Sequence, residues 1–232
     1  MKIELTWPET ADEPLLAAVH RVLHAVVELG GAVGYLAPPT RDETDPWVEA
    51  TLAMARKGEG RLALATVDGT VQAMGLWRRG QEAVFRHSAE VGKVMAHPQA
   101  RGLGLGRVVV AGLADDARAA GIETLTLRAR GNNHGAIALY QSLGFREWGR
   151  LPNVVEVGEW RFDEVNMYLE LGRPPGTVLH GSSPGGPGSS PQPGSSPQPT
   201  TSPQPTTSPQ PTTSPQPGPS PRPQPGFSPG PG

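Results

Sequence analysis

The sequence predicts a mixed α/β domain whose elements follow the order β-α-α-β-β-β-α-β-α-β-β around a central sheet. One support is the Asp68-Gly69 pair between two β-rich runs, which is typical of a tight hairpin. The other is the succession of a predicted strand at residues 89–96, a helix at 105–120 and a strand at 122–127. Strands separated by a helix in this way indicate at least one parallel crossover and hence an α/β sheet.

The N-terminal elements are indicated by alternation and by helix-capping residues. Residues 2–7 alternate as a short strand does. Either Thr10 or Asp12 suits the N-cap of the following helix, and Pro14 fits its first turn. Apolar residues then recur at helical spacing as far as Gly30, which predicts one amphipathic helix.

The other predicted elements are bounded by glycine and proline. Gly121 and Gly144 stop two helices, because glycine adopts the left-handed conformation in which helices commonly end. Residues 31–39 are apolar but interrupted by glycine and proline, which indicates a loop. The remaining predictions are a helix at 40–57, hairpin strands at 62–67 and 70–77, a helix at 133–143, and strands at 145–149 and 165–171.

The folded core is expected within residues 1–172, because the rest of the chain has little apolar surface. From Pro174 onward lie 20 of the 27 prolines, and only Arg222 is charged apart from His180. Residues 173–232 include three copies of Ser-Pro-Gln-Pro-Thr-Thr and are predicted to form a disordered tail that favours polyproline II. Such a tail is either a spacer or ligand for proline-binding modules, or an inert solubilising segment.

Composition argues against several functional classes. The formal net charge is −2, so nothing in it calls for a nucleic-acid partner. The chain contains no cysteine, which excludes disulfides and a thiol nucleophile. His87, His97 and His134 lack i, i+4 spacing and a completing carboxylate, so we expect no metal site. No signal peptide and no membrane-length apolar run is evident, so we expect no membrane partner and a cytoplasmic protein.

A glycine-rich loop joins the predicted strand at 89–96 to the helix at 105–120. Its glycines let the backbone approach a ligand closely, and the helix N-terminus adds free N–H groups. Together these features predict an anion site suited to a pyrophosphate. Arg107 stands where the dinucleotide fingerprint needs glycine, and no P-loop Lys-Ser/Thr pair follows. The alternative is a tight strand-to-helix connection without a ligand.

Two motifs occur in order along the chain. The first is Arg101-x-x-Gly104-x-Gly106, and the second, from Asn133 to Phe145, fits N-x-x-A-x-x-L-Y-x-x-x-G-F. Together they resemble the signatures of the GNAT superfamily, over residues 1–172. The resemblance implies the acyl-CoA N-acyltransferase fold, acetyl-CoA as co-substrate and direct attack of an amine on its thioester. Residues 30–36 and 89–95 are more narrowly similar to the tabtoxin-resistance type of acetyltransferase.

The resemblance also implies which residues bind acetyl-CoA. Backbone groups of one strand end pair with the pantetheine arm as a neighbouring strand would, and an N–H there polarises the acetyl carbonyl. These residues are Val94, Met95 and Ala96. The residues that would bind the pyrophosphate are Arg101, Gly102, Leu103, Gly104, Leu105 and Gly106. Asn133 bonds the pantetheine arm or caps its helix, and the two roles are compatible.

Catalysis requires a base that deprotonates the amine and a group that protonates or stabilises the departing thiolate. Glu90 is the candidate base, because it begins the strand that ends at the cofactor. The alternative is a surface carboxylate paired with Lys93 or Arg86. The resemblance places Tyr140 near the sulfur, where a phenol transfers a proton or donates a hydrogen bond. The alternative is a core tyrosine.

Three hypotheses about the function follow, of which the first two differ in the acceptor. The first is a small-molecule primary amine, which is favoured because the apolar loop at 31–39 suggests a lid over the site. The second is a peptide or protein amine, which needs an open groove. The third is a non-catalytic acyl-CoA-binding protein, against which the presence of both Glu90 and Tyr140 argues. The sequence gives no signal for the oligomeric state.

Overall fold

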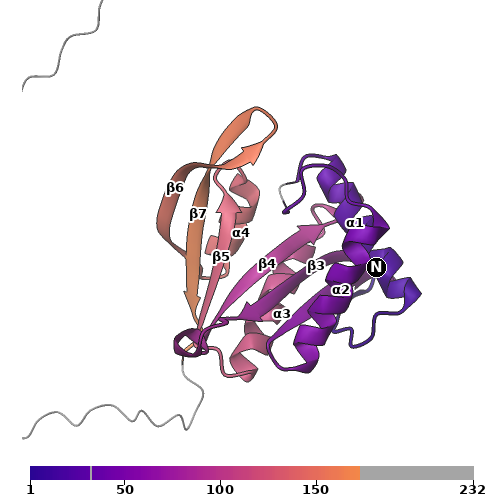
Figure 1. Ribbon diagram of the computed structural model, residues 1–232, viewed down its shortest axis with the longest axis horizontal. Coiled ribbons are helices and arrows are strands. Elements are labelled where there is room, and N and C mark those ends of the chain that lie inside the picture. Colours follow the sequence, from indigo (N-terminus) through magenta and orange to yellow (C-terminus); the bar gives the residue numbers. More distant parts are fainter. Residues whose placement is uncertain (32, 173–232) are drawn as a thin grey trace, which may run out of the picture. The chain divides into compact units, whose positions relative to one another are not determined.

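The computed structural model describes residues 1–31 and 33–172. Within these ranges, seven strands form one sheet in the order β1-β2-β3-β4-β5-β7-β6 (Figure 1). The predicted tail at residues 173–232 lies outside the described residues. The elements are β1 (Ile3–Thr6), α1 (Glu13–Glu28), α2 (Arg41–Arg56), β2 (Gly60–Val67), β3 (Thr70–Arg79), β4 (Ser88–Ala96), α3 (Leu105–Ala119), β5 (Thr124–Arg130), α4 (His134–Ser142), β6 (Arg146–Val157) and β7 (Trp160–Glu170). Short 3₁₀ turns lie at Ala83–Phe85 and Pro98–Ala100.

This order of helices and strands confirms the predicted one. The predicted boundaries are wrong at β5, which begins at Thr124 and not at residue 122. Ile122 instead closes the end of α3, because its N–H donates to the carbonyl of Ala117. The last two strands are longer than predicted. Most residues of β6, the edge strand, are exposed, so the strand carries no clear alternation of polar and apolar residues.

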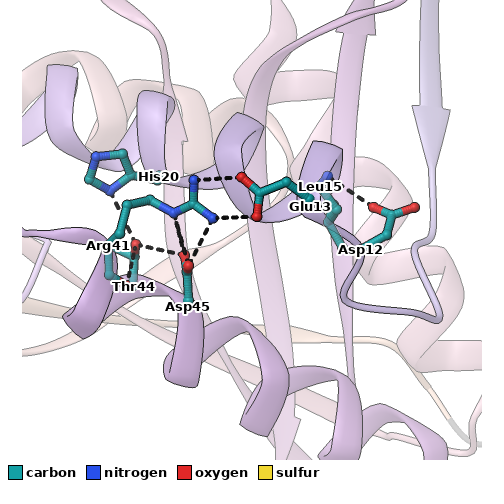
Figure 2. A network of polar contacts seen from close by, with 7 residues as sticks. All are labelled: Asp12, Glu13, Leu15, His20, Arg41, Thr44 and Asp45. Carbon is teal, nitrogen blue, oxygen red and sulfur yellow. Dashed lines mark hydrogen bonds and ion pairs between the residues drawn. The ribbon is translucent and has the colours of Figure 1, made fainter.

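Side-chain caps define the starts of α1 and α2. Asp12 accepts a hydrogen bond from the N–H of Leu15 at 3.0 Å, which selects Asp12 over Thr10 as N-cap. Arg41, the first residue of α2, joins the two helix starts, as Figure 2 shows. Its guanidinium contacts the carboxylate of Glu13 at 3.0 Å and that of Asp45 at 2.8 Å. These contacts hold the two helices together beside the loop that connects them.

The helices cover both faces of the sheet (Figure 1). Helices α1 and α2 pack on the face that carries Met74 and Leu76 of β3. Helix α3 packs on the opposite face, which carries Ala73 and Trp77 of the same strand. Alternate residues of one strand therefore belong to two separate cores, as the period-two geometry of a strand requires.

The parallel pairing of β4 with β5 is short. It covers only residues 88–91 of β4 and 124–127 of β5, although both strands continue beyond these limits. Toward their carboxyl ends the two strands splay apart (Figure 1). On its other side β4 stays paired with β3 as far as Ala96. The sheet is therefore opened at its centre, and residues 92–96 present an unpaired strand edge to the opening.

The structure carries no sign of a membrane-spanning helix in the part of the chain that it describes: none is both long enough and apolar enough. The longest helices, α1 and α2, have 16 residues each and are amphipathic. Their buried side chains pack against the sheet, and their polar side chains form contacts such as those of Arg41.

Candidate active site

A cleft of about 790 Å³ lies where β4 and β5 diverge. It is bordered by the end of α1 and the loop after it, by α2, by β4 and β5, by the start of α4, and by the β6–β7 hairpin. Of the residues predicted from the sequence, the cleft brings together Glu90, Val94, Met95, Ala96, Arg101, Asn133 and Tyr140.

A β-bulge at Lys93 shapes the strand that borders the cleft. The register between β3 and β4 shifts between Met74 and Leu76, and Lys93 has a φ of 52°. A non-glycine residue in this left-handed region is strained, which is typical of functional sites. Gly75 of β3 lies beside this irregularity, where a Cβ would approach Val109 Cγ1 to 2.8 Å. The bulge redirects Val94, Met95 and Ala96, so their unpaired edge can accept an extended ligand.

The glycine-rich loop has the geometry that a phosphate group requires. Gly102 and Gly104 have φ values of 81° and 74°, and a Cβ built at either meets nothing within 4 Å. Gly104 is the N-cap of α3 and supplies no side-chain cap. The N–H groups of Leu105 and Gly106, in the first helical turn, therefore have no intrahelical acceptor. The loop can thus bring several N–H groups and a helix dipole to one anion.

Only Arg101 of this loop borders the cleft itself. Leu105 is buried in the core with 1% of its surface exposed. At Gly106 a Cβ would come within 3.0 Å of Leu139 Cδ2, so this glycine also permits close packing of α3 against α4. The glycine-rich loop therefore lies beside the cleft and is continuous with it through Arg101.

Glu90 lies inside the cleft, but its ion-pair partners differ from those considered in the sequence analysis. Its Oε1 is 2.8 Å from Nη2 of Arg128, and its Oε2 is 3.5 Å from Nη2 of Arg78. Neither Lys93 nor Arg86 pairs with it; Arg86 pairs with Glu59 instead. The reason is the strand register, because Arg78 lies directly across from Glu90 on β3. Both carboxylate oxygens are thus already engaged.

Tyr140 projects from α4 and is almost fully buried, with 7% of its surface exposed. Burial raises the pKa of its phenol to about 12. Its ring packs against Phe145 at a centroid separation of 5.9 Å, and its hydroxyl bonds to no described residue. Tyr140 is therefore packed in the core and also borders the cleft, so packing in the core is compatible with a contact to a ligand.

Asn133 caps α4. Its Oδ1 accepts a hydrogen bond from the N–H of Ala136 at 3.2 Å, as the sequence analysis expects of a helix-starting asparagine. The amide nitrogen of the same side chain takes no part in this cap. Because Asn133 also borders the cleft, the cap and a contact with a ligand are compatible.

Several charged residues that border the cleft were not predicted from the sequence. Arg128 and Arg130 lie on β5, and Glu164 lies on β7. Glu164 pairs with Arg128 at 3.7 Å. The alternation along β5 could have indicated the two arginines, because the buried residues Leu125, Leu127 and Ala129 alternate with them. That period places both arginines on one face, opposite the face covered by α3.

The loop between α1 and α2 is hydrogen-bonded to residues of both β4 and β5, the two strands that border the cleft. Lys93 Nζ donates a hydrogen bond to the carbonyl of Val33 and lies 4.6 Å from the ring centroid of Tyr35. Burial lowers the pKa of this ammonium group. On the other wall, Nη2 of Arg130 lies 3.5 Å from the carbonyl oxygen of Gly30. The described part of the loop therefore covers the side of the cleft that faces α1 and α2.

Among residues 1–31 and 33–172, histidine and carboxylate side chains form no cluster of three that suits a metal ion. His97 illustrates the point, because its ring lies near a backbone N–H. Its Nδ1 accepts a hydrogen bond from the N–H of Gln99 at 3.4 Å, which places this side chain in the turn that ends β4.

Comparison with known proteins agrees with this geometry. The family model described as "Acetyltransferase (GNAT) family" matches residues 32–145. The [Ribosomal protein bS18]-alanine N-acetyltransferase of Escherichia coli strain K12 is 32% identical over 127 residues, which cover 54% of this chain and 82% of that protein. The chain belongs to the GNAT family of acetyltransferases.

Other relatives differ in the acceptor that their names indicate. The L-amino acid N-acyltransferase MnaT of Escherichia coli strain K12 is 36% identical over 88 residues, covering 38% of this chain and half of that protein. The ribosomal-protein-alanine N-acetyltransferase of Brucella melitensis has a TM-score of 0.64 and 26% identity, over 72% of this chain and 99% of that one. The fold also matches yncA of Salmonella typhimurium, solved with acetyl-CoA, at a TM-score of 0.65 and 22% identity over 77% and 99% of the two chains.

Proposed function

We propose that this protein is an acetyl-CoA-dependent N-acetyltransferase that acetylates the primary amine of a small molecule. The observation that carries the proposal is the cleft between the diverging ends of β4 and β5. Within it an unpaired strand edge, a phenol and a carboxylate converge, and a phosphate-type loop adjoins it. This is the set of groups that direct acetyl transfer from a thioester to an amine requires.

The residues present fit acetyl-CoA. In this proposal the open edge at Val94, Met95 and Ala96 hydrogen-bonds the pantetheine arm, and the loop from Arg101 to Gly106 binds the pyrophosphate. Acetyl-CoA supplies an acetyl group activated as a thioester. Asn133 adds a side-chain amide to the same cleft, where it would contact the pantetheine arm. The left-handed glycines and the absence of a side-chain cap at Gly104 support this assignment.

Glu90 is the proposed acceptor of the amine proton. An alkyl amine of pKa about 10.4 is neutral in roughly one molecule in 2,500 at pH 7, a deficit of about 4.6 kcal/mol. A carboxylate at the base of the opening between β4 and β5 offsets part of this deficit. Its Oε2 is the more available oxygen, because its contact with Arg78 is 3.5 Å long. The amine reaches it directly or through one water molecule.

Tyr140 is proposed to donate a hydrogen bond to the departing thiolate. With its pKa raised to about 12, the phenol stays protonated at neutral pH. Complete transfer of its proton to a thiolate, whose conjugate acid has a pKa near 8.5, is uphill by about 5 kcal/mol. The raised pKa therefore favours stabilisation through a hydrogen bond over complete transfer of the proton.

The acceptor is assigned to the small-molecule class because the loop after α1 is fastened over the cleft. Contacts of Lys93 with Val33 and of Arg130 with Gly30 hold the described part of this loop in place. The amino-acid acceptor in the name of one relative supports the same class. A peptide N-terminus is the second candidate, and the relative named for ribosomal-protein alanine favours it.

The test is a panel of acceptors with purified protein and acetyl-CoA, followed by release of free CoA thiol and by mass spectrometry of the products. We expect acetylation of small primary amines at rates well above thioester hydrolysis. Acetylation of peptide N-termini alone would move the acceptor to the second candidate. Hydrolysis without any acetylated amine would contradict the proposed enzyme function altogether.

A further inference from the structure

We propose that the acceptor amine also carries a carboxylate, and that Arg130 binds this group. The inference deepens the proposed N-acetyltransferase function and rests on it. It starts from the charges that border the cleft. The cationic side chains are Arg78, Lys93, Arg101, Arg128 and Arg130, and the carboxylates are Glu90 and Glu164.

Neither carboxylate forms an ion pair with Arg130, although Glu164 lies across from it in the pairing of β5 with β7. Glu90 pairs with Arg128 and Arg78, and Glu164 pairs with Arg128. Three cations of the cleft, Lys93, Arg101 and Arg130, consequently have no carboxylate partner among the described residues. A cleft that gathers unpaired positive charge favours an anionic ligand and raises its local concentration.

The three cations serve different parts of the cleft. Arg101 continues into the glycine-rich loop and is accounted for by the pyrophosphate of acetyl-CoA. Arg130 lies on the other face of the sheet, because the residues flanking it in β5 alternate into the core beneath α3. It meets the loop after α1 at Gly30, on the same side as Glu90 and Arg128. Arg130 therefore belongs to the acceptor side.

The guanidinium of Arg130 is poorly satisfied. Its only hydrogen bond among described residues is the 3.5 Å contact of Nη2 with Gly30, and its Nε is buried without any partner. The ring centroid of Phe162 lies 5.1 Å from its Cζ, within the range of a cation–π contact. A guanidinium has five N–H donors in a rigid fork that matches a carboxylate. Buried donors without acceptors are costly, so a ligand carboxylate would relieve this cost.

Lys93 adds positive potential from the opposite wall. Its ammonium group donates to the carbonyl of Val33 and lies 4.6 and 5.6 Å from the ring centroids of Tyr35 and Trp47. These partners carry no net negative charge, so the charge of Lys93 is not cancelled. Two uncompensated cations on the acceptor side repel polyamines and other polycations, while they attract an amine that bears an anionic group.

The test compares acceptors that differ only in the anionic group. Alanine, leucine, methionine and phenylalanine are each assayed beside the corresponding amide and the decarboxylated amine. We expect kcat/KM for the preferred amino acid to exceed that for its amide at least tenfold, or about 1.4 kcal/mol. Equal or faster acetylation of the amides and simple amines would overturn the inference while leaving the N-acetyltransferase function intact. Acetylation of peptides alone would overturn both this inference and the small-molecule acceptor, and acetylation of no amine at all would contradict the N-acetyltransferase function as well.

A variant series assigns the effect to Arg130. Arg130→Gln is expected to lower the acid-to-amide ratio of kcat/KM at least tenfold, mainly through KM for the acid, and Arg130→Lys to lower it less. Arg161→Gln, which removes an exposed ion pair with Glu156 outside the cleft, is the matched control and leaves the ratio unchanged. Thermal melts establish that each variant is folded. An unaltered ratio in folded Arg130→Gln would show that the carboxylate binds elsewhere or not at all.

Discussion

Nη2 of Arg128 on β5 lies 2.8 Å from Oε1 of Glu90 on β4, one residue before the pairing of these two strands ends. The ion pair joins the strands at the base of the opening, where Glu90 borders the cleft. Arg128 also contacts Glu164 on β7, so a single guanidinium links three strands. The geometry of the proposed base is therefore set by long-range contacts.

If Glu90 accepts the amine proton, Glu90→Gln should lower kcat/KM for the amine at neutral pH by about 10² or more. The amide keeps the size of the side chain but cannot take up a proton. Glu164→Gln is the matched control, because it removes another carboxylate partner of Arg128. We expect the control to lose much less activity. Initial rates over a range of pH test this, and comparable losses in the two variants would identify an electrostatic role for Glu90.

Tyr140→Phe should lower kcat by about 10² to 10³ and change KM for acetyl-CoA little, because the hydroxyl acts when charge builds on sulfur. Ring packing against Phe145 survives the substitution. Tyr168→Phe, on β7 and outside the cleft, is the control. Single-turnover measurements isolate the chemical step. If Tyr140→Phe keeps more than half of the wild-type rate in that step, the tyrosine is a packing residue only.

Gly104→Asp should weaken acetyl-CoA binding at least tenfold. The carboxylate would repel the pyrophosphate, and the side chain would obstruct backbone approach. Gly121→Asp is a close control, since Gly121 has a φ of 80°, open space around it and a place at the far end of α3. Both variants share the left-handed strain. Isothermal titration calorimetry should record weaker binding only for Gly104→Asp, and equal affinities would locate the cofactor elsewhere.

Stability should fall as the pH drops below about 6.5. Burial first, and then His24 and Arg41, lower the pKa of His20 from its ordinary value of 6.5, whereas Asp45 acts in the opposite direction. The unfolded chain therefore binds a proton at a higher pH than the folded protein does. This contribution to stability is complete above the unfolded pKa and is lost as the pH falls toward the folded pKa.

Thermal melts between pH 7.5 and 5.5 test this. His20→Gln should flatten the fall in Tm relative to the wild type, whereas substitution of the exposed His134 should not. In the His20→Gln variant the Tm should still fall slightly with falling pH, because burial also lowers the pKa of His97. A wild-type Tm that is constant over this range would refute the prediction. The hydrogen bond of His20 Nδ1 with Thr44 at 3.1 Å, drawn in Figure 2, makes this histidine part of the α1–α2 contact.

Local patterns determined the order of the elements and the cofactor side of the candidate site. The Asp68-Gly69 turn and the glycine-rich loop depend on residues close together in the chain, so the sequence indicated them, and it narrowed the cap of α1 to Thr10 or Asp12. Tyr140 was proposed from a resemblance to a family motif within one helix and its flanks, and its role stays a prediction. Short-range conformational preferences explain why the turn and the loop could be predicted.

Tertiary structure alone decided the acceptor side. The partners of Glu90, the position of Arg130 and the fastening of the loop by Lys93 depend on which strands are neighbours and where a bulge shifts their register. The length of the edge strand β6 was also underpredicted, because most of its residues are exposed. Such features join residues far apart in the sequence. Their energies come from pairings that exist only once the sheet has formed, so the sequence alone could not reveal them.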